Sequence, residues 1–209
     1  MEDNYKTIAN NIRIERKIKR CKFITSIKSV KTTEEAEKFI DQIAEEFSDA
    51  THNVSAFKVG LADQAITRCS DDGEPAGSSG PPALQALEGR GVTNVAVVVT
   101  RYFGGVKHGV GGLIRAYGDS VREVIKEAGI EERVRYLKFS ITISYDLLGG
   151  VINYLEGSSG QVKNVEYKAN GVEVIGLIKP SFFTSLTAKI KEATKGEAEI
   201  KIKGDEFRG

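Results

Sequence analysis

The amino-acid sequence predicts an α+β protein with two domains, residues 1–132 and residues 133–209. The chain has 209 residues, enough for one large or two small domains, and 40% of them are hydrophobic, which supports packed cores. A charged connection at residues 129–135 marks the predicted boundary. Beyond it the pattern gives strand, helix, strand, strand, helix, strand. This order predicts a ferredoxin-like domain with both helices on one face of an antiparallel sheet.

The first domain begins with a polar and charged segment, residues 1–16, in which no element is predicted. A strand is predicted next, at residues 22–30. Thr32 supplies a hydroxyl cap for the following helix, and the acidic side chains of Glu34 and Glu35 suit the positive end of its dipole. Apolar residues then recur at helical spacing and predict one buried face, formed by Ala36, Phe39, Ile40, Ile43, Ala44 and Phe47.

Further strands and helices complete the first domain. Residues 53–60 alternate as a strand, and residues 62–67 form a turn that leads into a short strand. The prolines at positions 81 and 82 suit the first turn of a helix, where no N–H donor is needed. Residues 93–101 are β-branched and apolar on both faces, which predicts a central strand. A long helix follows at residues 112–128.

The second domain contains two helices and four strands. The helices are predicted at residues 146–156 and 181–194, the second of them capped by Ser181. Asn170 and Gly171 form a strong hairpin signal between the two middle strands. The four strands are predicted at residues 137–145, 161–168, 172–178 and 199–203.

Composition restricts the functional classes. The formal net charge is +1, so the chain as a whole is not attracted to nucleic acid or to an anionic membrane, and any basic patch is local. No stretch reaches the roughly 18 apolar residues of a membrane span, and the N-terminus lacks a signal-peptide core. We therefore expect a cytoplasmic protein with no membrane partner. The two cysteines are expected to be reduced thiols, and two cysteines with two histidines are too few for a predicted metal site.

Most residues that could bind a ligand or take part in catalysis lie in two glycine-rich loops. The second loop, residues 101–112, joins the central strand to the long helix, as phosphate-binding loops do. It does not match the dinucleotide fingerprint, because Ile114 stands where the third glycine belongs, and no Walker motif is present. Cationic side chains in the loop suit an anion, and Tyr102 and Phe103 suit stacking on bases. The alternative is a tight turn whose aromatic residues pack into the core.

The first loop, residues 70–80, carries three carboxylates, those of Asp71, Asp72 and Glu74. Such a group suits a hard cation or a general base. The alternative is turn chemistry, with the acids paired to nearby arginines. No cofactor is assigned. The two loops together give the predicted ligand-binding set: Arg68, Asp71, Asp72, Glu74, Ser78, Ser79, Arg101, Tyr102, Phe103, Gly104, Gly105, Lys107, His108, Gly111, Gly112 and Arg115.

The two histidines receive different interpretations. His52 lies between Thr51 and Asn53 and is interpreted as a structural histidine. His108 lies within the second glycine-rich loop, and it is the better functional candidate because its charge changes near neutral pH.

Three blocks of the sequence resemble the YigZ/IMPACT family. SDDGEPAGSSG at residues 70–80 is similar to the family signature SDDGEPSGTAG. VVTRYFGGVKHGVGGLIRAY at residues 98–117 is similar to VVTRYFGGxKLGxGGLxRAY, and ATHNV at residues 50–54 to ATHNC. The resemblance implies a UPF0029-type N-terminal domain like domain 2 of ribosomal protein S5. It also implies a DUF1949-type, ferredoxin-like C-terminal domain similar to the last domain of elongation factor G.

These observations leave three functional hypotheses open. The favoured one is an RNA-binding or ribosome-associated protein, a translation regulator, that uses the glycine-rich cationic surface, since no complete catalytic set is visible. The alternative is a metal-assisted hydrolase of a phosphorylated or peptide substrate, in which the acidic loop faces His108 and Arg115. A third is a protein partner bound to the open face of the C-terminal sheet, near Lys168, Glu173 and Lys201.

Overall fold

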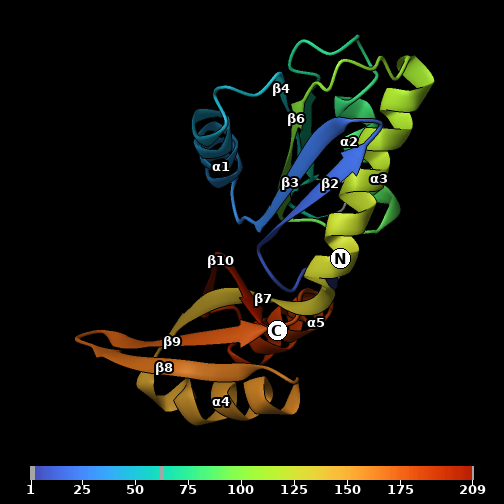
Figure 1. The fold of residues 1–209 in the computed structure, drawn as a ribbon. Coiled ribbons are helices and arrows are strands. Elements are labelled where there is room, and N and C mark those ends of the chain that lie inside the picture. Colours follow the sequence, from blue (N-terminus) through green and yellow to red (C-terminus); the bar gives the residue numbers. More distant parts are fainter. Residues whose placement is uncertain (1–2, 62–63, 209) are drawn as a thin grey trace. The chain divides into compact units, whose positions relative to one another are not determined.

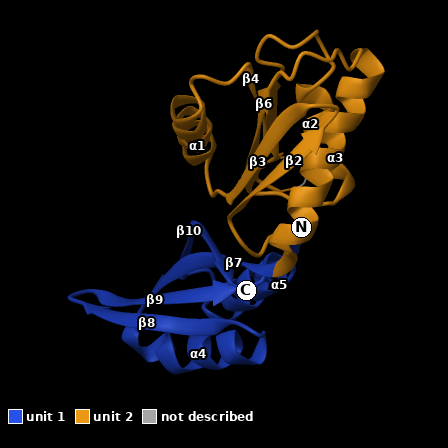
Figure 2. Ribbon diagram, in the orientation of Figure 1, with its two compact units in different colours: residues 1–5, 133–209 blue, residues 6–132 orange. Residues whose placement is uncertain are grey.

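A computed structural model describes residues 3–61 and 64–208. The chain forms two compact units, one of residues 6–132 and the other of the described parts of residues 1–5 and 133–209 (Figure 2). The sequence placed the first residues in the N-terminal domain, whereas the structure places residues 3–5 in the second unit. The reason is pairing: β1 (Asn4–Ile8) joins the sheet of that unit, and the Asp3 carbonyl accepts a hydrogen bond from the Arg135 N–H.

The unit of residues 6–132 is built on a five-stranded antiparallel sheet (Figure 1). Its central strand corresponds to the strand predicted at residues 93–101, for which both faces were expected to be buried. The strand order is β2 (Ile12–Ile18), β3 (Cys21–Ser29), β6 (Val95–Tyr102), β4 (His52–Val59) and β5 (Ile66–Ser70).

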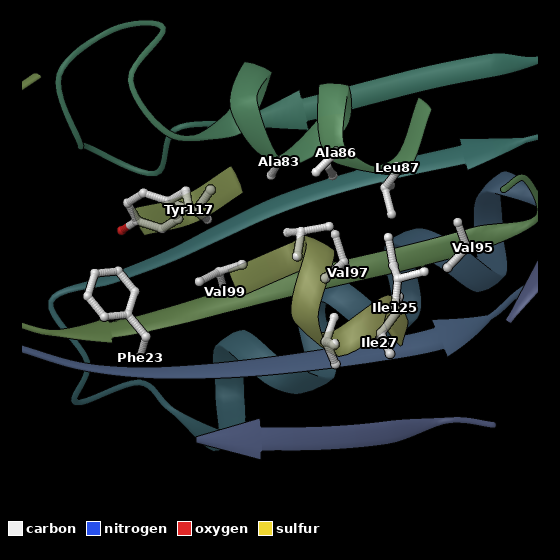
Figure 3. Close-up of a cluster of buried hydrophobic side chains, with 14 of the residues drawn as sticks. Phe23, Ile27, Ala83, Ala86, Leu87, Val95, Val97, Val99, Tyr117 and Ile125 are labelled. Carbon is white, nitrogen blue, oxygen red and sulfur yellow. The ribbon is translucent and has the colours of Figure 1, made fainter. Parts of the chain in front are cut away.

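Three helices cover the two faces of this sheet. α1 (Thr33–Glu46) packs on one face, and the Thr32 hydroxyl accepts a hydrogen bond from the Glu35 N–H, as the capping prediction requires. α2 (Gly80–Gly89) and α3 (Val110–Ala128) pack on the other face. Figure 3 shows alternate residues of β3 and β6 pointing at α2 and α3. Each fully buried large apolar side chain in such a core contributes about 1.5–3 kcal/mol.

The second unit contains the predicted ferredoxin-like arrangement. β10 pairs with β7, β7 with β9 and β9 with β8, each pair antiparallel, and β1 joins the same sheet. Side chains from both helices pack with the strands in one core, so the α+β fold class is confirmed. The elements are β7 (Ile130–Ile143), a short 3-10 helix (Tyr145–Leu147), α4 (Leu148–Gly157), β8 (Gln161–Lys168), β9 (Gly171–Ile178), α5 (Pro180–Ala193) and β10 (Glu199–Arg208).

Several predicted elements differ from the structure. The segment of residues 1–16, in which no element was predicted, contains β1 and β2. The connection predicted at residues 129–135 is mostly the first part of β7, where residues 130–133 alternate between exposed and half-buried although three of them in a row are charged. Ser181 does not cap α5, since Lys179 occupies the cap position and Pro180 the first turn. Of the turn predicted at residues 62–67, positions 62 and 63 lie outside the described residues.

Within residues 3–61 and 64–208, no helix is both long enough and apolar enough to cross a membrane.

Candidate functional site

A cleft of about 500 Å³ lies where the two glycine-rich loops meet the beginning of β4 and of α3. The cleft combines apolar walls with several cationic and hydrogen-bonding side chains, as small-ligand sites do. Both predicted loops contribute to it. The lining residues are Thr51, His52, Glu74, Pro75, Arg101, Phe103, Lys107, His108, Gly109, Val110 and Leu113.

The floor of the cleft is a buried ion pair between Arg101 and Glu74. Arg101 is 5% exposed and Glu74 is 8% exposed, and Arg101 Nη1 lies 2.5 Å from Glu74 Oε1. The Tyr117 hydroxyl donates a second hydrogen bond to the same oxygen, at 2.7 Å. Burial and this hydrogen bond raise the pKa of Tyr117, so the phenol remains a neutral donor. Arg101 and Tyr117 therefore both donate to one oxygen of Glu74.

His52 lies beside this pair and lines the cleft. Its Nδ1–H donates to the Asp72 carbonyl oxygen at 2.7 Å, because a carbonyl only accepts. That bond directs Nε2 toward Glu74, where it lies 3.8 Å from Oε2. The sequence interpretation of His52 as a purely structural histidine missed its position in the cleft. The signal available in the sequence was its membership of the block at residues 50–54.

The second terminal nitrogen of the Arg101 guanidinium contacts the Cys21 thiol and the His108 imidazole. Arg101 Nη2 lies 3.5 Å from Cys21 Sγ and 3.4 Å from His108 Nδ1. The Gly104 N–H also donates to Cys21 Sγ, at 3.3 Å, so the fully buried sulfur anchors the second loop. Burial lowers the pKa of His108 below its ordinary value, and the positive charges of Arg101 and Lys19 lower it further. His108 is therefore neutral at neutral pH.

This environment predicts a pH-dependent stability that involves His108. Its pKa is lower in the folded than in the unfolded state, so the unfolded state binds the proton first as the pH falls below about 6.5. Stability from this group is therefore present at pH 7.5 and is lost on acidification. We expect His108→Gln to lose less stability than the wild type between pH 7.5 and pH 5.5, as measured by urea unfolding. Equal losses in the two proteins would contradict the expectation.

The three carboxylates of the first loop have separate structural roles. Asp71 accepts hydrogen bonds from the N–H groups of Gly77, Ser79 and Gly80 and so holds the start of α2. Burial opposes a low pKa for Asp71, but these bonds, with one from the Ser79 hydroxyl, hold its pKa below the ordinary value. Asp72 Oδ2 accepts from the Asn53 N–H at 2.5 Å.

A carboxylate cluster for a metal is not formed by this loop. Glu74 faces Arg101, whereas Asp71 and Asp72 bind backbone groups of neighbouring segments. Nowhere among the described residues do three or more His, Cys, Asp or Glu side chains form a group that could hold a metal ion. The described residues therefore offer no set of metal ligands for the metal-assisted hydrolase considered from the sequence. The first loop fits the alternative, in which its acidic residues stabilise the turn and pair with a nearby arginine.

Other predicted site residues are divided between the cleft and its surroundings. Phe103 lines the cleft and is 46% exposed, and Lys107 lines it with an exposed side chain. Arg68 does not reach it, since it pairs with Glu37 of α1 and lies beside a smaller cavity. The hydroxyl of Tyr102 donates to Asp49. Ser78 and Ser79 are buried, Gly105 lies in the second loop, and Gly111, Gly112 and Arg115 belong to the first two turns of α3.

Two cations that the sequence analysis missed lie close to the second loop. Lys19 and Arg20 form the exposed turn between β2 and β3, both with positive φ. The charge of Lys19 acts on His108, and the backbone of Arg20 contacts the backbone at Gly104. The turn was missed because β2 was not predicted. We call Lys19, Arg20, Lys107 and Arg115 the cationic rim, and within the described ranges none of the four forms an ion pair.

The close approach at Gly104 leads to a stability prediction. A Cβ atom at this position would lie 1.9 Å from the Arg20 carbonyl oxygen, so the hairpin turn or the second loop has to move. We expect Gly104→Ala to cost about 1–3 kcal/mol or more in urea unfolding. Gly111→Ala is the matched control, since the nearest atom to its Cβ is 3.9 Å away, and alanine favours the helix. A Gly104→Ala protein as stable as the control would contradict this packing.

The predicted protein-binding face of the second unit has its charges largely paired with one another. Lys168 and Lys203 both pair with Glu173, and Lys201 pairs with Glu199. The hydrogen bond from Lys168, with another from Ser140, lowers the pKa of Glu173 to about 2. A protein partner at this face stays a prediction.

Comparisons with known proteins identify both halves of the chain. Residues 19–125 match the Impact N-terminal domain, and residues 141–197 match a domain of unknown function, DUF1949. The chain is 38% identical over 184 residues to the IMPACT family member YvyE of Bacillus subtilis, covering 88% of this chain and 84% of that protein. It is 30% identical over 190 residues to YigZ of Escherichia coli, with coverage of 90% and 93%. A solved structure titled as a hypothetical protein is 28% identical, with a TM-score of 0.67 and coverage of 96% and 97%. The chain therefore belongs to the IMPACT family.

Proposed function

We propose that the protein binds single-stranded RNA, free or within a ribosome, at the cleft of the N-terminal unit. The observation that carries the proposal is an exposed aromatic ring, Phe103, in a cleft whose neighbouring cations are not balanced by carboxylates. The formal net charge of the chain is only +1, so this local excess of positive charge is not a consequence of composition. A role in translation regulation would follow from binding of this kind.

Phe103 supplies a stacking surface. The Arg101 guanidinium lies 5.5 Å from the centroid of its ring, and the Phe103 N–H donates to the Thr51 hydroxyl at 3.0 Å. Backbone and ring are therefore both held while 46% of the residue stays exposed. A base stacked on an aromatic side chain contributes about 1–3 kcal/mol, with little dependence on sequence.

The cationic rim supplies the phosphate contacts. Lys107 lines the cleft, and the other three cations lie on segments that contact the second loop or follow it. Each neutralised phosphate of a single strand contributes about −0.7 to the slope of log affinity against log salt. Four contacts give a slope of about −3, which is about a 50-fold loss of affinity when the salt concentration is raised fourfold.

Fluorescence anisotropy with a labelled 12-nucleotide RNA of mixed sequence, at low and at moderate salt, tests the proposal. We expect Lys107→Ala to weaken binding and to make the salt slope shallower by about 0.7, because one phosphate contact is lost. Lys38→Ala is the matched control, since Lys38 is exposed on α1, across the sheet from α2 and α3. Absence of RNA binding at both salt concentrations, or equal effects of the two substitutions, would overturn the proposal.

A further inference from the structure

We infer that the floor of the cleft binds a phosphate monoester, carried by the end of an RNA chain or by a free mononucleotide. The inference rests on the proposed function and narrows it, because it separates a terminal phosphate from the phosphodiesters within a strand. Three groups of N–H donors around the cleft carry the argument. They are the Arg101 guanidinium, the His108 imidazole and the first turn of α3.

Arg101 keeps one buried donor without a partner. Its Nη1 binds Glu74 and its Nη2 faces Cys21 and His108, but its Nε has no hydrogen-bond partner and is inaccessible to water. A buried donor left unsatisfied destabilises the protein, because no hydrogen bond replaces the ones that it made with water. Arg101 is 95% buried and lines the cleft, so a ligand oxygen there becomes the acceptor for Nε when the side chains that cover this atom move aside.

His108 supplies a second donor of the same kind. A guanidinium only donates, so the 3.4 Å contact with Arg101 Nη2 makes Nδ1 of the neutral imidazole the acceptor. The proton of the ring is then on Nε2. This atom is buried and forms no hydrogen bond of good geometry, although the backbone carbonyls of Ile18 and Val106 lie near the ring. Both unsatisfied atoms are donors, and both residues line the same cleft. The arrangement therefore selects a ligand with several acceptor oxygens.

The start of α3 adds backbone donors and a positive dipole end. Gly109 and Val110 line the cleft. The Gly109 carbonyl accepts from the N–H groups of Gly112 and Leu113, so the donors offered by the start of this 19-residue helix are those of Val110 and Gly111. Such a helix start attracts anions. At Gly111 an added Cβ would meet Arg115 Nη1 at 3.9 Å, so the surface at this turn has room for an anion and lies close to a second guanidinium.

The buried floor favours a terminal group over a continuous strand. Arg101, Glu74 and Leu113 are all at least 92% buried, so they limit how far a strand can extend into the cleft, and only a chain end or a free nucleotide fits fully inside. A volume of about 500 Å³ suits a ligand of that size. The Glu74 carboxylate does not repel the anion strongly, since Arg101 and Tyr117 both donate to it. A monoester dianion gains more than a phosphodiester monoanion from the same donors.

The experiment compares RNA 12-mers of one sequence with an internal fluorophore and different ends. We expect a 12-mer that carries a phosphate on its 5′ or its 3′ end to bind at least about tenfold more tightly than the 12-mer with hydroxyls on both ends, which corresponds to 1.4 kcal/mol. We also expect adenosine monophosphate to displace the phosphorylated RNA. Calorimetry with adenosine monophosphate and with inorganic phosphate separates the contribution of the nucleoside from that of the phosphate group.

Each outcome decides a different claim. Equal affinity for all ends, with no displacement by the mononucleotide, overturns the monoester site and leaves RNA binding in place. Binding of the mononucleotide without any RNA binding supports the monoester site and overturns the proposed function. Absence of binding for every probe overturns both.

Two variants test the donor at His108 through the ratio of affinities for phosphorylated and unphosphorylated ends. Glutamine places an amide N–H donor near the position of Nε2, whereas leucine has none. We expect His108→Gln to keep most of the preference and His108→Leu to reduce it from about tenfold to below about threefold. A preference that survives in His108→Leu would exclude this imidazole from the site. Gly111→Asp is a second variant that leaves the floor intact; its added carboxylate is expected to remove the preference, and an unchanged preference would exclude the start of α3.

Discussion

Arg101→Ala is expected to lower the free energy of unfolding of the N-terminal unit by about 3–5 kcal/mol. The substitution removes the partner of Glu74 and leaves its carboxylate buried, with the Tyr117 hydroxyl as its remaining strong donor. It also removes the donor to Cys21 and the cation beside the rings of Phe23 and Phe103. Urea unfolding followed by circular dichroism measures the loss. A test of ligand binding with this variant would therefore be confounded by instability.

Arg68→Ala is the control for this prediction. Arg68 forms an ion pair with Glu37, but its side chain is 63% exposed, and exposed pairs contribute about 0–1 kcal/mol. Similar losses in the two variants would show that burial of the Arg101–Glu74 pair has no special weight, and the description of the cleft floor would then be wrong.

Phe103→Ala is expected to weaken binding of single-stranded RNA by about 5- to 140-fold, which corresponds to the 1–3 kcal/mol of one stacked base. The ring is 46% exposed and lies at the wall of the cleft rather than in a core cluster, so the fold is expected to survive. Anisotropy titrations at one salt concentration measure the change, and circular dichroism confirms that the variant is folded.

Ile114→Ala is the matched apolar control. Ile114 is 41% exposed on α3, in the turn after the residues that line the cleft, and it is not among them. Truncation there is expected to leave RNA affinity within about twofold of the wild type, since surface substitutions usually change free energies by less than about 0.5 kcal/mol. A loss at Ile114 as large as that at Phe103 would indicate a general effect of surface hydrophobicity and would contradict stacking.

Local patterns were sufficient for most of the fold. The hydroxyl cap of α1, the all-apolar run of β6 and the Asn-Gly turn between β8 and β9 are each encoded within a few residues. The ferredoxin-like order of the second unit followed from such local signals and is confirmed by the pairing of β10, β7, β9 and β8.

Two strand segments that were not predicted, β2 and the first part of β7, share one physical property. β2 lies at the edge of its sheet with half-buried isoleucines between charged residues, and four of the first six residues of β7 are charged. Strands that keep one face in water carry charges at every second position and resemble loops in composition. Because β2 was not predicted, the turn that contains Lys19 and Arg20 was not predicted either. These two residues of the cationic rim were therefore missing from the predicted site.

The site was predicted where its residues belong to one of the two glycine-rich loops. Phe103, Lys107 and His108 belong to one loop and line one cleft. The neighbours of Arg101 in the sheet come from strand register instead: β6 pairs with β3 so that Arg101 lies opposite Phe23, and with β4 so that it lies opposite His52. No spacing along the chain encodes such register, and the roles of Cys21 and Tyr117 remained hidden for the same reason.

Nuclear magnetic resonance of the uniformly ¹⁵N-labelled full chain, titrated with a single-stranded RNA 12-mer, tests the central claim most directly. The account predicts that the Arg101 Nε–H signal and the backbone amides of residues 107–110 shift as RNA is added, because these groups line the cleft. Shifts confined to residues 133–209, or to the α1 face of the N-terminal unit, would contradict the account and place RNA binding elsewhere on the protein.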